Sequence, residues 1–131
     1  AVPSIWILCA NAHQATLRAL EDDGEPQELF RFLQPAQRAL PGAAQDRLAQ
    51  LFGECLADLL KRAVQEKLFE RLVIVAPEPH ITRLVYGLDS RVFDQVVGML
   101  RRDATRMPPQ ELKALLHRSL PGQFAGRLAM R

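Results

Sequence analysis

Residues 45–79 read QDRLAQLFGECLADLLKRAVQEKLFERLVIVAPEP, and this stretch decides the fold. In its first part apolar residues recur at steps of three and one, the period of an amphipathic helix. They are Leu48, Leu51, Phe52, Cys55, Leu56, Leu59, Leu60 and Ala63. We therefore predict a long helix over Gln45–Lys67, roughly 34 Å in length at about 1.5 Å per residue.

The helical period breaks at Leu72–Ala76, an unbroken apolar run that is rich in β-branched residues. Such a run is typical of a strand that is covered on both faces. A helix leading into a doubly buried strand is half of an α/β layer unit. We expect this strand at the centre of a sheet, beside a second apolar run at Ser4–Ala10, with the long helix across one face.

Turn-forming residues and shorter apolar patterns predict the remaining elements. Two proline-led signals are clear: Pro77 ends the central strand, and Pro109 begins a helix whose apolar face carries leucines. The other expected elements are a strand over Ala15–Leu20, a strand around Leu29–Leu33, a loop over Gln34–Ala44, a short helix within Glu78–Leu88 and a strand near Val96–Arg101.

Length and composition favour one soluble domain over residues 1–131, with residues 118–131 as a loosely ordered tail. The chain is 48 % apolar and 24 % charged, as is ordinary for a globular protein. Cys9 and Cys55 both sit in apolar surroundings and indicate buried thiols in a reducing compartment. We expect a cytoplasmic protein without a membrane span, because no apolar run reaches the length that a span needs.

Two segments resemble the bacterial host attachment protein family. In the first, LFGECLADLLKRAVQEKLFERLVIVAPEPHITRLVYGL, the matching positions are Phe69, Leu72, Val75, Ala76 and Pro77. In the second, RRDATRMPPQELKALL, they are Arg102, Asp103, Thr105, Pro109, Glu111 and Leu112, while Ala104 replaces the family's usual leucine. The resemblance covers most of the chain up to about Leu116.

That family is grouped with bacterial relatives of the middle domain of archaeal and eukaryotic class-1 release factors. The resemblance implies an α/β fold with a mixed sheet and flanking helices, a ribonuclease-H-like layer. In true release factors the loop before the long helix carries Gly-Gly-Gln. Here the corresponding tip loop contains Gly42, Gln45 and Arg47 but lacks the adjacent triplet, so we expect no peptide release.

The sequence offers no catalytic or metal-binding constellation, and we predict neither enzymatic activity, nor a metal, nor a cofactor. His13, His80 and His117 lie in three different elements without ligand spacing. The two apolar strands hold no carboxylate for a divalent ion. Cys9 lies in an apolar strand, which raises a thiol's pKa and disfavours a nucleophile. Asp103 is expected to pair with a cation or cap a turn.

Charge separates the two parts of the chain. Residues 1–90 hold 9 Lys and Arg against 12 Asp and Glu, whereas residues 91–131 hold 8 against 3. The basic part suits contact with phosphates or an acidic partner, although a solvated face is the competing interpretation. The predicted contact residues are Arg101, Arg102, Arg106, Lys113 and Arg118. If the late strand continues through residue 103, alternation places Arg101 and Asp103 on one face.

The sequence therefore predicts a non-catalytic, translation-related binding domain that associates with the ribosome or with structured RNA through its basic part. The alternative is a protein-interaction domain with a protein partner and an indirect role in attachment to host cells.

Overall fold

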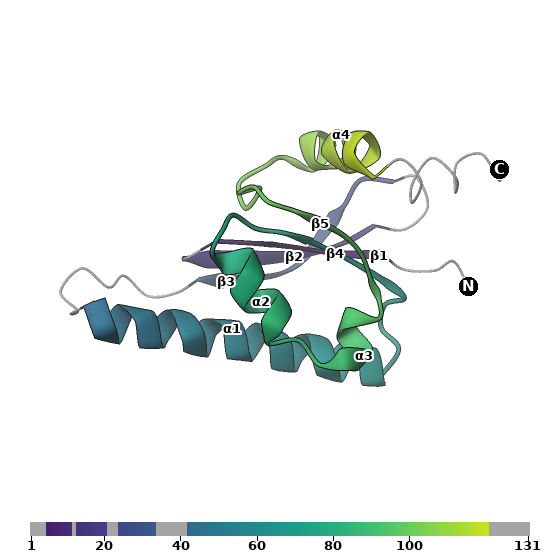
Figure 1. The fold of residues 1–131 in the computed structure, drawn as a ribbon. Coiled ribbons are helices and arrows are strands. Elements are labelled where there is room, and N and C mark those ends of the chain that lie inside the picture. Colours follow the sequence, from purple (N-terminus) through teal and green to yellow (C-terminus); the bar gives the residue numbers. More distant parts are fainter. Residues whose placement is uncertain (1–4, 12, 21–23, 34–41, 121–131) are drawn as a thin grey trace.

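The computed structural model describes residues 5–11, 13–20, 24–33 and 42–120, with backbone alone for residues 33, 42–46, 48–50 and 52. A five-stranded sheet lies between two helical layers (Figure 1). The elements in chain order are β1 (Ile5–Ala10), β2 (Gln14–Leu20), β3 (Gln27–Leu33), α1 (Gly42–Gln65), β4 (Arg71–Val75), α2 (His80–Tyr86), α3 (Ser90–Phe93), β5 (Val96–Leu100) and α4 (Pro109–Ser119).

The sheet is mixed, with the strand order β3-β2-β1-β4-β5. β1, β2 and β3 pair antiparallel, while β4 runs parallel to β1 and β5 runs parallel to β4. The predicted α/β class, mixed sheet and flanking helices are confirmed. One detail differs, because β1 occupies the centre and β4 lies between β1 and β5.

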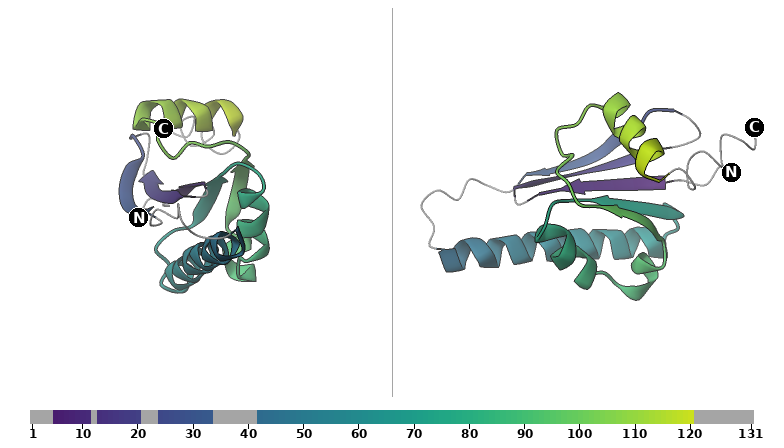
Figure 2. Two further views of the ribbon diagram at one scale, coloured as in Figure 1. Left: turned by 90° about the vertical axis from the view of Figure 1, so that its left-hand side faces the viewer. Right: turned by 45° about the horizontal axis from the view of Figure 1, so that its top comes forward.

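The two faces of the sheet carry separate apolar cores. Helices cover both faces (Figure 2). On one face, α1, α2 and α3 pack over Trp6, Leu8, Leu72 and Ile74. On the other face, α4 contributes its buried leucines, Leu112, Leu115 and Leu116, to a core with Ile5, Ile7, Cys9, Val73 and Val75. Because both faces are covered, β1 and the apolar positions of β4 are buried throughout, which explains their unbroken apolar runs.

Phe69 packs beneath β1 just before β4 begins. Its ring stacks on the Trp6 indole at 4.9 Å between centroids and 29° between planes. This stacking gives the phenylalanine that precedes the strand a structural role in the α1-side core.

The apolar stripe of α1 faces the sheet over its carboxyl-terminal half. Leu56, Leu60 and Ala63 are buried, whereas Leu51 is 38 % exposed. Cys55 is exposed, so the prediction of two buried thiols is wrong for this residue, because it lies at the margin of the stripe. The helix begins at Gly42, three residues before the predicted start, and ends at Gln65, two residues before the predicted end.

α4 includes Arg118 and Ser119, the first two residues of the segment expected as a loosely ordered tail. Residues 121–131 lie outside the described part. At the end of the helix the Leu120 side chain lies across β5, where a Cβ on Gly98 would come within 2.5 Å of it.

In the described part of the chain, no helix is long and apolar enough to cross a membrane.

Candidate functional site

The carboxyl ends of β1, β4 and β5 meet at one edge of the sheet, because these three strands run parallel. In open α/β sheets this edge is where ligands bind. Here β1 is followed by Asn11, β4 by Ala76–Glu78, and β5 by the segment Arg101–Arg106, which we call the arginine loop.

Asp103 joins the arginine loop to the β1–β2 turn. Its Oδ1 accepts hydrogen bonds from the backbone N–H of Thr105 at 3.0 Å and from the Thr105 hydroxyl at 2.7 Å. Its Oδ2 accepts from the Asn11 amide at 2.9 Å. Burial raises the pKa of the Asp103 carboxyl, but the hydrogen bonds from Asn11 and Thr105 outweigh this and hold the pKa below its ordinary value. Asp103 therefore acts as a turn cap, one of the two roles predicted for it.

Thr105 is buried and completes this junction. Its Oγ1 accepts hydrogen bonds from Asn11 Nδ2 at 3.2 Å and from Gln14 Nε2 at 3.1 Å. The side-chain Oδ1 of Asn11 in turn accepts hydrogen bonds from the backbone N–H groups of His13 and Gln14. Between the two anchoring residues, the Ala104 side chain is buried in the α4-side core. The Asp-Ala-Thr sequence thus fixes the course of the loop.

Arg101 departs from its predicted partner. β5 ends at Leu100, so strand alternation does not extend to Asp103. The Arg101 guanidinium instead lies 3.7 Å from the Glu78 carboxylate, across the carboxyl edge. Glu78 also accepts a hydrogen bond from the Thr82 hydroxyl at 2.6 Å, and this bond is the largest cause of its lowered pKa. Arg101 therefore connects the arginine loop to the segment before α2 through an exposed ion pair.

Arg102 and Arg106 are exposed on the arginine loop. Among the described residues, neither makes an ion pair within 4 Å, although the positive charge of Arg106 helps to lower the pKa of Asp103. The hydrogen bonds of Asp103 to Asn11 and Thr105 fix the backbone of the loop. The two guanidinium groups are therefore exposed to solvent on an ordered loop.

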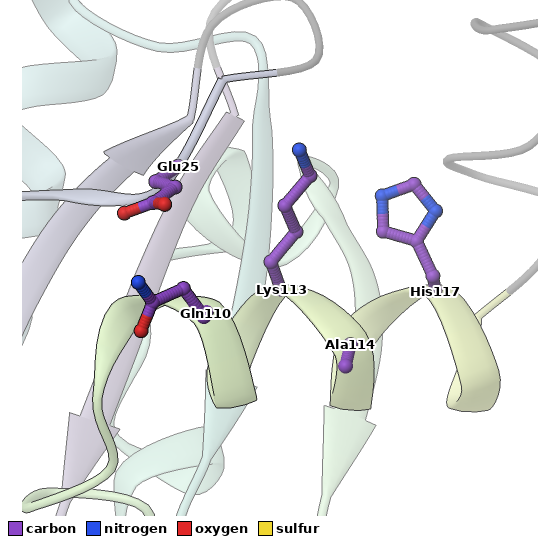
Figure 3. A pocket seen from close by; sticks show the side chains of 5 residues that line it. All are labelled: Glu25, Gln110, Lys113, Ala114 and His117. Carbon is purple, nitrogen blue, oxygen red and sulfur yellow. The ribbon is translucent and has the colours of Figure 1, made fainter.

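The other predicted contact residues, Lys113 and Arg118, lie on α4. Lys113 lines a shallow hollow of about 370 Å³ together with Glu25, Gln110, Ala114 and His117 (Figure 3). Arg118 is exposed in the last turn of α4, about 14 Å along the helix from its first residue at about 1.5 Å per residue. The structure therefore brings Arg101, Arg102 and Arg106 together and leaves Arg118 apart from them.

His13 and His80 interact electrostatically at the carboxyl edge, which the sequence interpretation did not predict. His80 opens α2, and its pKa is lowered by burial first, then by electrostatic interaction with Arg83 and His13. The signal was present in the sequence, since His13 follows β1 and His80 follows the neighbouring parallel strand β4. Among the described residues, no group of three or more His, Cys, Asp or Glu is placed to hold a metal ion.

The model of bacterial archaeo-eukaryotic release factor family 12 matches residues 35–116. The chain belongs to this family. The solved structure of an archaeal translation termination factor, aRF1, is similar with a TM-score of 0.59 at 15 % identity, covering 97 % of this chain and 41 % of that one. A second structure, described as an archaeal protein, is similar with a TM-score of 0.55 at 17 % identity, covering 97 % of this chain and 40 % of that one. No curated protein sequence matches.

The family-12 chain thus spans about two-fifths of the length of these archaeal structures. The TM-scores show a shared fold, and at such low identity they show the fold alone. The family assignment confirms the predicted kinship with release factors. The host attachment name suggested by the sequence motifs stays a prediction.

The three residues predicted for a tip loop, Gly42, Gln45 and Arg47, all lie on α1. Gly42 and Gln45 have helical backbone in its first turns, so the predicted loop over Gln34–Ala44 is wrong for residues 42–44. Their side chains, and residues 34–41, lie outside the described part. Arg47 is exposed on the same helix. α1 begins at the same end of the molecule as the carboxyl edge (Figure 1).

Proposed function

We propose that this family-12 domain is a non-catalytic binding module of the translation apparatus that contacts the ribosome or structured RNA through its arginine loop. The family assignment supports the relation to translation. The proposed contact rests on one observation. Arg102 and Arg106 are exposed on a loop whose backbone is fixed by hydrogen bonds between Asp103 and Thr105.

Ordered arginines suit phosphate recognition for two physical reasons. A guanidinium presents several N–H donors in a planar fork that matches phosphate oxygens. A loop that is already fixed loses less conformational entropy on binding than a mobile one. The hydrogen bonds between Asn11, Asp103 and Thr105 therefore favour binding without touching the RNA themselves.

The state of the polar groups supports a non-catalytic role. Asp103 accepts three hydrogen bonds within the protein, and Glu78 is engaged by Thr82 and Arg101. Burial raises the pKa of the Cys9 thiol to about 12, so this thiol remains protonated at neutral pH.

Co-sedimentation with ribosomes at low and high salt tests the proposal. The wild-type protein is expected in the ribosomal pellet at low salt, and the double variant Arg102→Glu/Arg106→Glu in the supernatant. A matched control is Arg62→Glu/Arg91→Glu, which changes the net charge equally. Both control residues are exposed and carry weak surface ion pairs to Asp58 and Asp89 on the α1 and α3 side. Equal sedimentation of the two double variants would contradict a specific role for the arginine loop.

A protein-interaction domain with an indirect role in attachment to host cells is the second candidate. The edge strand β3 favours it, because Leu29 and Phe30 are 43 % and 51 % exposed, and the Phe30 ring stacks on Phe32. An apolar contact of this kind resists salt, whereas a phosphate contact weakens with it. Association that persists at high salt and does not depend on Arg102 and Arg106 would favour this candidate.

A further inference from the structure

The turn after β1 and the segment after β4 place His13 and His80 at the same part of the carboxyl edge. β1 and β4 run parallel with Cys9 opposite Val75, so the residues that follow the two strands leave the sheet side by side. His13 is exposed in the turn between β1 and β2, and His80 is half-buried at the first residue of α2. The non-catalytic binding role assigns no task to this histidine pair.

Polar contacts connect both histidine-bearing segments to the arginine loop. On the β1 side, Asn11 Oδ1 accepts a hydrogen bond from the backbone N–H of His13 at 2.8 Å, and Asn11 Nδ2 donates to Asp103 Oδ2 at 2.9 Å. On the β4 side, the Glu78 carboxylate lies 3.7 Å from the Arg101 guanidinium. The histidine pair and the arginine loop are therefore held together at one edge of the sheet.

The charged groups around the histidine pair are mostly cationic. They are the exposed arginines Arg83, Arg101, Arg102 and Arg106 and the two carboxylates Glu78 and Asp103. Each of these carboxyl groups has a pKa below its ordinary value, so both stay ionised at pH 6 and above. Among the described residues, neither imidazole lies within 4 Å of a carboxylate oxygen. Of the groups described at this edge, the histidines are thus the ones whose charge changes between pH 6 and 8.

A phosphate at this edge would favour the protonated form of the histidines. Burial first, and then electrostatic interaction with Arg83 and His13, lowers the pKa of His80. A nearby negative charge acts in the opposite direction, because it stabilises the imidazolium. Protonation and phosphate binding therefore strengthen each other, as linkage between two binding events requires. A protonated imidazole also offers two N–H donors to phosphate oxygens.

We propose that the phosphate-binding surface of the arginine loop continues across the carboxyl edge to His13 and His80, and that RNA binding is coupled to proton uptake by this histidine pair. The inference rests on the proposed function and adds a pH dependence to it. The affinity for RNA increases as the pH falls from 8 to 6, because the imidazoles gain positive charge while the charge of the arginine loop stays constant.

Co-sedimentation with purified ribosomes at pH 8 and pH 6, each over a salt series, tests the proposal. The affinity of the wild-type protein is expected to be about tenfold higher at pH 6, since a neighbouring opposite charge shifts a pKa by about one unit or more. The slope of log affinity against log salt is expected to steepen by about 0.7–0.9 for each histidine that gains a phosphate contact.

His13→Gln/His80→Gln is expected to bind as wild type does at pH 8 and to lose the increase at pH 6. Glutamine is uncharged at both pH values, and its backbone N–H at position 13 retains the hydrogen bond to Asn11. His117→Gln is the matched control on α4 and is expected to keep the full increase. Melting temperatures at both pH values check that the variants are folded. If the double variant melts lower, His13→Gln alone, in an exposed turn, is expected to lose about half of the added salt slope.

The inference is overturned if the wild-type protein binds equally at pH 6 and pH 8, or if the double histidine variant keeps the increase. Loss of the increase in His117→Gln would also overturn it. Failure of the proposed function gives a different result, in which Arg102→Glu/Arg106→Glu binds as wild type does at pH 8. Absence of ribosome binding at both pH values would overturn both.

Discussion

At the scale of single residues, the Asp103 carboxylate accepts hydrogen bonds from its own loop and from Asn11, 92 positions away in the sequence. Thr105 and Gln14 extend this junction into the buried part of the protein. The motif Arg-Asp-Ala-Thr therefore has a structural explanation, in which Asp103 and Thr105 anchor the loop and leave Arg102 at the surface.

Asp103→Asn is expected to lower the free energy of unfolding by about 1 kcal/mol at pH 7, a value reduced for the solvent exposure of this side chain. The folded-state pKa lies below the ordinary value of 3.8, so the stabilisation is present above about pH 4 and disappears as the pH falls through the folded-state pKa. Urea titrations at pH 7, 5 and 3 measure this. The difference between wild type and variant should be equal at pH 7 and 5 and smaller at pH 3. A difference that grows toward pH 3 would contradict the assignment.

The two thiols are expected to differ in reactivity. Cys55 is exposed on α1, whereas Cys9 is buried in β1 with its pKa raised to about 12. Because the thiolate is the reactive form, iodoacetamide at pH 8 should modify Cys55 and spare Cys9 in the native protein. Mass spectrometry is expected to find one modification natively and two in guanidinium. Rapid native labelling of Cys9 would show that β1 is accessible.

At the scale of elements, α1 contributes to the core through its carboxyl-terminal half. Leu56→Ala is expected to cost about 2–5 kcal/mol, because Leu56 is buried against the sheet. Leu59→Ala should lower the free energy of unfolding by less, because Leu59 is half-buried. Leu51→Ala is the matched control on the same stripe and should change stability by less than about 1 kcal/mol, since Leu51 is already 38 % exposed. Thermal or urea unfolding measures all three, and equal effects at Leu56 and Leu51 would contradict this packing.

Most elements were predictable because their signals are local. The apolar runs of β1 and β4, the period of α1 and the proline at the start of α4 each depend on adjacent residues. The start of α1 was misplaced because Pro41 and Gly42 are common in loops, although proline also occurs immediately before or within a first helical turn. The exposure of Cys55 and Leu51 depends on how far the sheet extends beneath the helix, which no local pattern contains.

At the scale of the whole molecule, the site is assembled from segments that are distant in sequence. The excess of positive charge after residue 90 was visible in the sequence, whereas the ion pair of Arg101 with Glu78 across the carboxyl edge was not. The pairing of β1 with β4 brings Asn11, His13 and His80 to one edge. Such long-range contacts follow from strand order, and strand order is a property of the complete sheet.

Kinship with release factors raises the question of peptide release. The Gly-Gly-Gln triplet is absent from the region of Gly42 and Gln45, so Gln45→Ala is expected to leave both folding and any hydrolysis of peptidyl-tRNA unchanged. A ribosomal peptidyl-tRNA assay with wild type and variant measures this. Hydrolysis that requires Gln45 would replace the binding role with an enzymatic one.

The salt dependence of RNA or ribosome binding tests the central claim most directly. Each phosphate contact contributes about 0.7–0.9 to the slope of log affinity against log salt, through release of counterions. The wild-type protein is predicted to show a negative slope. Arg102→Gln/Arg106→Gln should flatten it by about 1.4–1.8, corresponding to two lost contacts, with the melting temperature nearly unchanged. An affinity that does not depend on salt, or a slope that is the same in both proteins, would contradict RNA recognition by the arginine loop.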